Sequence, residues 1–161
     1  MKLAPIILSS LLLSGCARAG VDIPKLKESA RWQPKPELTW QWQLKGDINT
    51  SYDVDVYDID LFDTPVDTIR QLHDKGIKVI CYFSAGTYED SRPDAADFPS
   101  GVLGKALADW PDERWLDVSK LDVLAPIMTA RVDLARQKGC DAVELDNVDG
   151  YDNNTGFNLT K

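Results

Sequence analysis

The sequence is poor in histidine and in basic residues. It has one histidine, and 18 Lys and Arg stand against 26 Asp and Glu, so the formal net charge is -8. Because His73 falls late in a polar helical segment, we expect it at the surface, which leaves no histidine for a catalytic triad or a metal site. A phosphate-binding face needs a surplus of Lys and Arg, so the charge argues against nucleic acid as a partner. We expect no cofactor, no metal, and a cationic or neutral ligand.

No long apolar run is evident either. Residues 6–13 are apolar but too few to cross a bilayer. Lys2 precedes them and small residues follow, which is the pattern of an export signal. The letters LSGC at 13–16 resemble the lipobox of bacterial lipoproteins, which implies cleavage before Cys16 and acylation of its thiol. The alternative is an ordinary signal peptide that contains a cysteine.

These features predict residues 1–15 as a lipoprotein signal peptide and residues 16–36 as a tether, because the latter mix Lys, Glu, Ser and Pro without a hydrophobic period. The protein would be exported and attached to a membrane by its N-terminal lipid. By resemblance to lipoprotein sorting rules, Ala17 after the cysteine favours the outer membrane or cell surface.

Cysteine is also scarce, with three in the chain. Without Cys16, the pair Cys81 and Cys140 is left in an oxidising compartment, so a disulfide is permitted. Both fall in predicted strands or beside them, and we predict two buried free thiols.

From about residue 38, short apolar runs alternate with helical patterns, as expected for βαβ units and a mostly parallel sheet. Strands are predicted at 39–44, 54–62, 78–84 and 141–146. Helices are predicted at 65–75, with Thr64 as N-cap and Pro65 at the first helical position, and at 126–138, ended by Gly139. The stretch 85–124 is long for a connection and is either a functional loop or holds further elements, including a short strand at 115–118.

Side chains along a strand alternate between two faces. One face of each predicted strand is apolar and suits covering helices. The other face turns polar toward the strand's C-terminal end, where it carries Asp58, Asp60, Tyr82, Ser84, Glu144 and Asp146. Burying these carboxylates in a core would be costly. Because parallel α/β sheets bind ligands beyond the carboxyl ends of their strands, we predict that these groups converge on a site.

Five segments in order resemble glycoside hydrolase family 114: TWQWQL (39–44), VYDIDLF (56–62), VICYFSAG (79–86), WLDV (115–118) and VELDNVDGY (143–151). The resemblance implies an α/β fold of the (β/α)8 TIM-barrel type and an endo-α-1,4-polygalactosaminidase that cleaves galactosamine-rich exopolysaccharide. A complete barrel takes roughly 250 residues. We therefore expect residues 37–161 to form its N-terminal part, truncated at the C-terminus, with about four or five strands.

The resemblance also implies a retaining mechanism with an aspartate nucleophile and a glutamate acid/base. Such pairs lie roughly 5 Å apart across the scissile bond. The aspartate matches Asp146, and the glutamate is expected beyond Lys161. The alternative for Asp146 is an aspartate that only caps the loop after its strand.

We predict that five further residues bind the substrate: Asp60, Tyr82, Glu144, Asn147 and Asp149. A salt-bridged carboxylate remains the alternative for Glu144, and a turn residue for Asp149. Carboxylates in a cleft suit an amino-sugar polysaccharide because its free amines are cationic near neutral pH.

Three questions stay open at this level. Glu89, Arg92 and Asp94 either line the site or belong to a solvated loop. The tryptophans at 40, 42, 110 and 115 either stack on sugars or, as we expect for most of them, pack in the core. The protein is either an enzyme or a non-catalytic surface lipoprotein that binds amino-sugar polymer, and an enzyme could alternatively use a neighbouring acetamido group.

Overall fold

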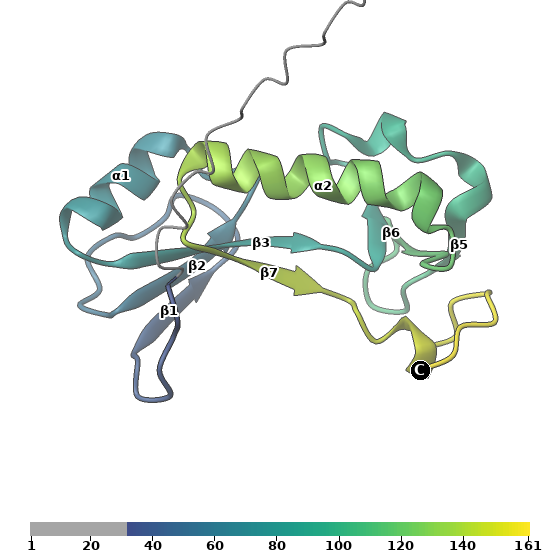
Figure 1. The fold of residues 1–161 in the computed structure, drawn as a ribbon, viewed down its shortest axis with the longest axis horizontal. Coiled ribbons are helices and arrows are strands. Elements are labelled where there is room, and N and C mark those ends of the chain that lie inside the picture. The colour runs from purple at the N-terminus through teal and green to yellow at the C-terminus, as the bar shows by residue number, and fades with distance from the viewer. Residues whose placement is uncertain (1–31) are drawn as a thin grey trace, which may run out of the picture. The chain divides into compact units, whose positions relative to one another are not determined.

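The computed structural model describes residues 32–161, and the predicted signal peptide, Cys16 and most of the predicted tether lie outside that range. Four parallel strands form the main sheet in the order β1-β2-β3-β7 (Figure 1): β1 (Trp40–Gln43), β2 (Val56–Asp60), β3 (Lys78–Ser84) and β7 (Ala142–Asp146). All four strands lie where the alternation of apolar runs predicted them.

Two helices, α1 (Val66–Asp74) and α2 (Leu121–Lys138), cover one face of this sheet (Figure 1). Their contact face is built from the strand residues predicted to point toward helices, and the core holds Tyr57, Ile59, Val79, Cys81 and Phe83 together with Ile69, Leu72 and Ala135. The predicted alternation of the two strand faces is therefore confirmed. The opposite face carries no helix within the described residues.

The helix boundaries depart from the prediction in two places. Pro65, not Thr64, is the N-cap of α1, and its side chain makes no capping hydrogen bond. The second helix begins at Leu121, so Pro126 lies inside it rather than at its start. Proline there removes one main-chain hydrogen bond, but the long helix retains the others. Gly139 ends α2 with a φ of 92°, as the sequence predicted.

The long connection after β3 contains a second, antiparallel sheet. Its strands β4 (Thr87–Glu89), β5 (Leu103–Ala106) and β6 (Glu113–Leu116) pair in the order β4-β6-β5, and short 3-10 helices occupy Ala95–Asp97 and Ser100–Val102. A third 3-10 helix, Gly150–Asp152, follows β7. The strand predicted at 115–118 thus lies two residues earlier. A separate apolar cluster of Phe98, Val102, Leu116 and Leu124 joins this insertion to α2.

A buried arginine also joins the insertion to the main sheet. Arg131 of α2 is 1% exposed and makes a two-pronged ion pair with Asp94, with distances of 2.7 and 2.9 Å. Its third guanidinium nitrogen donates to the main-chain oxygen of Ser84 at 2.8 Å. The rings of Phe62, Phe83 and Phe98 surround the cation, so its charge is fully compensated in a water-poor setting.

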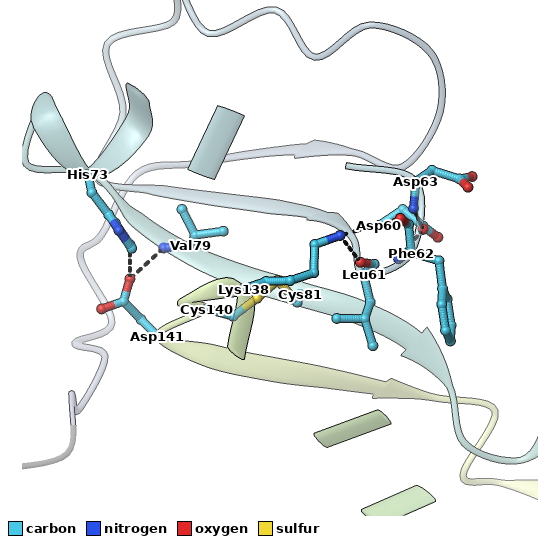
Figure 2. Close-up of a disulfide and its surroundings, with 10 residues drawn as sticks. All are labelled: Asp60, Leu61, Phe62, Asp63, His73, Val79, Cys81, Lys138, Cys140 and Asp141. Carbon is cyan, nitrogen blue, oxygen red and sulfur yellow. Dashed lines mark hydrogen bonds and ion pairs between the residues drawn. A yellow bond between two sulfur atoms is a disulfide. The ribbon is translucent and has the colours of Figure 1, made fainter. Parts of the chain in front are cut away.

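Cys81 and Cys140 form a disulfide that connects β3 to a position two residues before β7 (Figure 2). The prediction of two free thiols is wrong. The two residues are 59 apart in the chain, but the parallel pairing of β3 with β7 brings their Cα atoms to 6.0 Å, which suits a disulfide. Sequence spacing alone could not reveal this pairing.

The amino ends of β3 and β7 are tied together next to the disulfide. The carboxylate of Asp141 accepts hydrogen bonds from His73 at 2.9 Å and from the Val79 amide at 3.0 Å (Figure 2), and a third from Lys78 at 2.6 Å. Burial opposes the charged form, but these donors outweigh it and lower the pKa of Asp141. His73 is thus a partly exposed structural residue at the end of the sheet away from Asp146.

Within residues 32–161, neither helix is both long enough and apolar enough to cross a membrane.

Candidate active site

The carboxylate of Asp146 lies at the carboxyl end of β7 and is held by three hydrogen bonds. The Tyr82 hydroxyl donates to Oδ2 at 2.9 Å, the Asn147 amide donates to Oδ1 at 2.8 Å, and the Asn147 side chain donates to Oδ2 at 3.2 Å. Burial and the neighbouring Asp146 raise the pKa of Tyr82, so this donor keeps its proton. The predicted nucleophile is therefore a fixed carboxylate, oriented by two of the residues predicted beside it.

The turn after Asp146 requires an unusual main chain. Asn147 has a φ of 59°, in the left-handed region that asparagine tolerates better than most residues. The amides of Ala85 and Gly86 donate to the main-chain oxygen of Asp146 at 2.9 and 3.1 Å. A Cβ atom on Gly86 would lie 1.7 Å from the Asn147 oxygen, so only glycine allows this approach. The ends of β3 and β7 are thus locked together around the carboxylate.

Hydroxyl groups extend the network from Asn147 into the insertion. The Asn147 side chain donates to Ser84 at 3.0 Å and to Thr87 at 3.3 Å, and these two hydroxyls contact each other. Thr87 in turn donates to Glu113 on β6 at 2.9 Å. Burial raises the pKa of Glu113 despite the Thr87 hydrogen bond. Neither Thr87 nor Glu113 was predicted as a site residue, because β4 is too short to show a pattern and the strand predicted at 115–118 began after Glu113.

Asp60 lies at the end of β2, but the structure does not bring it to the open face with Asp146. Its carboxylate is 3% exposed and accepts the main-chain amides of Phe62 and Asp63, both at 2.8 Å. Arg92 pairs with it at 2.7 Å and with Glu89 at the same distance. Arg92 and Glu89 therefore belong to a buried ion-pair network that fixes the loop after β2.

Asp58 and Glu144 lie on the polar face of the sheet, on either side of β3. Glu144 is exposed, whereas Asp58 is buried, and its Oδ1 atom has no hydrogen-bond partner among the described residues. Burial and the adjacent Glu144 raise the pKa of Asp58 to about 8. Asp58 therefore keeps its proton at neutral pH.

The remaining predicted site residues are less constrained. Asp149 is exposed and precedes the 3-10 helix at Gly150–Asp152, and no hydrogen bond of its side chain appears within the described residues. Trp40 and Trp42 pair in register with Val56 and Asp58 and are 65% and 56% exposed. Trp110 is also exposed and only Trp115, at 8%, is buried, so the prediction that most of these tryptophans pack in the core is wrong.

The chemistry of this edge is that of a carboxylate site. Tyr82 and Asn147 orient the carboxylate of Asp146, and the side chains of Glu144 on β7 and Glu113 on β6 belong to the same edge. Across residues 32–161, no three His, Cys, Asp or Glu side chains are grouped so as to hold a metal ion.

A parallel sheet covered by helices on one face, with a carboxylate at the carboxyl end of the edge strand β7, has the arrangement of part of a (β/α) barrel. The sequence model of glycoside-hydrolase family GH114 matches residues 23–161, and the chain belongs to that family. The match begins inside the segment predicted as a tether.

Solved structures agree with this assignment. The chain is 51% identical to Aspergillus fumigatus Ega3, whose crystal structure is a complex with galactosamine; the match has a TM-score of 0.78 and covers 82% of this chain and 53% of Ega3. The glycoside hydrolase domain of PelA from Pseudomonas aeruginosa shares the fold, with 14% identity, a TM-score of 0.55 and coverage of 71% and 45%. The chain thus spans about half the length of these structures, and its four parallel strands form an incomplete barrel. No curated protein sequence matches it significantly.

Proposed function

We propose that the protein is a glycoside hydrolase that cleaves α-1,4 linkages in galactosamine-containing exopolysaccharide. The observation that carries the proposal is the fixed carboxylate of Asp146 at the end of β7, held by Tyr82 and Asn147. Membership of GH114 and the likeness to a galactosamine-bound relative support the substrate class.

In the proposed mechanism Asp146 attacks the anomeric carbon and forms a glycosyl ester as the glycosidic C–O bond breaks. A glutamate beyond Lys161 donates its proton to the leaving oxygen and then takes a proton from the water that hydrolyses the ester. The hydrogen bonds from Tyr82 and the Asn147 amide keep Asp146 oriented toward the substrate before it binds.

Negative charge near Asp146 supports an amino-sugar substrate. The exposed carboxylates of Glu144 and Asp149 lie on the same strand or on the turn that follows it. In a cleft, such groups attract a cationic amine and can accept its charge-assisted hydrogen bonds. We propose that Glu144, Asn147 and Asp149 contact the sugar, whereas Asp60 acts through the loop that it fixes.

The test compares full-length protein with its Asp146→Asn variant on deacetylated galactosamine oligomers. We expect hydrolysis to fall at least about a thousandfold, because the variant lacks the nucleophile. Asp122→Asn, at an exposed position in the first turn of α2, is the matched control and should keep wild-type activity.

Three outcomes would contradict parts of the proposal. Normal hydrolysis by Asp146→Asn would remove Asp146 as nucleophile. If NMR of the released product shows that the configuration at the anomeric carbon is inverted, the retaining mechanism is excluded. Polymer binding without hydrolysis by the full-length wild type would favour the non-catalytic binding lipoprotein, and cleavage restricted to acetylated oligomers would favour participation of an acetamido group.

We further propose that the protein is a lipoprotein of the outer membrane or cell surface, anchored through Cys16. The support is the lipobox-like segment at 13–16 after a short export signal. Cys16→Ala should move the protein from the detergent phase to the aqueous phase on Triton X-114 partition, and unchanged partition would refute the anchor.

A further inference from the structure

A cavity that does not include Asp146 lies between the insertion and the segment that follows β7. It encloses about 430 Å³ and is lined by residues of β5, by the turn between β5 and β6, and by Asn153 and Asn154. This volume is within the range of small-molecule sites. The residues that contact Asp146 do not line the cavity, so the two places are distinct.

One wall of the cavity is aromatic. Trp110 is 53% exposed, and the Lys45 ammonium lies 5.0 Å from the centre of its ring. Because this cation comes from the loop after β1, it restrains the ring from outside the insertion. Trp115 lies deeper on β6 and is nearly buried. An exposed indole in a cavity offers a flat surface to the C–H face of a pyranose ring.

The other walls offer polar groups. Lys105 donates to the Asn154 side-chain oxygen at 2.7 Å, and the Asn153 side chain donates to the main-chain oxygen of Asp149 at 3.1 Å. Both amides are thus oriented, and the structure shows no hydrogen bond for the Asn154 Nδ2 group within residues 32–161. The exposed carboxylate of Asp109 also lines the cavity. Side-chain amides can hydrogen-bond to sugar hydroxyl groups, and a carboxylate can accept a charge-assisted hydrogen bond from a cationic amine.

The residues that line the cavity are connected to Asp146 through the turn that follows it. Asn153 reaches back to Asp149 in the turn after Asp146, and a Cβ on Gly150 would lie 3.6 Å from the Trp115 ring. The same β6 carries Glu113, which belongs to the hydroxyl network of Asn147. A polymer lying across the carboxyl ends of the strands would therefore meet both places.

We infer that this cavity binds an uncleaved amino-sugar unit of the polysaccharide, with Trp110 under the ring and Asn154 and Asp109 on its hydroxyl and amine groups. The inference rests on the proposed function and deepens it, because it adds a second contact for the same polymer. The enzyme then holds long chains in preference to short ones.

Binding is measured on full-length protein carrying Asp146→Asn, by titration with galactosamine oligomers of increasing length. Adding Trp110→Ala should weaken binding of long oligomers about tenfold, because truncation of an aromatic residue that anchors a ligand removes much of the binding energy of its site. The loss should grow with chain length. Asp109→Asn, at an exposed position, should reduce the preference for deacetylated over acetylated chains. Tyr52→Ala removes an exposed aromatic from the other cavity, at the amino ends of the strands, and should leave binding unchanged.

The inference would be overturned if Trp110→Ala left the affinity unchanged or lowered it equally for oligomers of all lengths. It would also be overturned if Tyr52→Ala lowered the affinity as much as Trp110→Ala does. These binding readouts do not depend on hydrolysis. The proposed function fails separately if full-length wild type cleaves no galactosamine polymer or if Asp146→Asn cleaves it normally.

Discussion

Removal of the Cys81–Cys140 disulfide should cost about 4 kcal/mol of folding free energy. The bond closes a loop across a sequence separation of 59 residues. In the chain-entropy treatment, a loop of that length loses about 14 cal/mol/K in the unfolded state, which is about 4 kcal/mol at 25 °C. Domains of this kind are stable by roughly 5–15 kcal/mol in total. The crosslink therefore supplies a large share of the stability.

The assay is urea unfolding of the full-length protein, with oxidised wild type compared to Cys81→Ala/Cys140→Ala. Alanine is used because Cys81 is fully buried on the apolar face, where a serine hydroxyl would lack a partner. With a slope of about 2 kcal/mol/M, the midpoint should fall by about 2 M. Wild type in strong reductant is the control and should unfold close to the double variant.

A midpoint shift that corresponds to less than about 0.5 kcal/mol would refute the entropic reasoning, because that is the range of inert surface substitutions. If the double variant is destabilised but fully reduced wild type is not, the lost free energy of unfolding comes from packing around residue 81 rather than from the crosslink.

Three further predictions concern the buried network, the turn and the carboxyl pair. Arg131→Ala should lower the free energy of unfolding by about 3–5 kcal/mol because it leaves its carboxylate partner uncompensated, whereas the exposed Arg136→Ala should stay within about 0.5 kcal/mol in the same urea titration. Gly86→Ala should reduce kcat about a hundredfold or more, because its Cβ would displace the turn after Asp146, the proposed nucleophile. Gly101→Ala, whose Cβ meets open space, should leave kcat unchanged. The pKa of Asp58 is about 8 in the folded protein, above its unfolded value of about 3.9, so the proton it holds stabilises the fold fully below pH 4 and this contribution is lost as the pH rises through 8. The Tm of Asp58→Asn should therefore rise relative to the Tm of wild type as the pH increases from 4 to 9. A difference in Tm that stays constant over this range would contradict the raised pKa.

The main sheet could be predicted from sequence because its strands follow simple rules. Val79, Cys81 and Phe83 alternate with Ile80, Tyr82 and Ser84, and only one set is apolar enough to meet helices. The same alternation placed Tyr82 and Asp146 on one face at neighbouring strand ends, where the structure joins them by a hydrogen bond.

Other features depend on contacts that a linear pattern does not carry. Asp60 has the alternation of a site residue, but Arg92, 32 positions away, neutralises it. The disulfide depends on the register of β3 with β7. Trp110 lies in the turn between β5 and β6, and these strands are too short and irregular for a period to appear, so its exposure could not be predicted.

The disulfide also has a consequence for chain integrity. It spans the antiparallel sheet, both of its 3-10 helices and all of α2, since these elements lie between residues 81 and 140. If a protease cuts an exposed turn between these two residues, such as the turn that carries Trp110, the two pieces stay joined covalently through the Cys81–Cys140 disulfide. If the protein is exported as proposed, such a cut would leave β3 and β7 linked and in register.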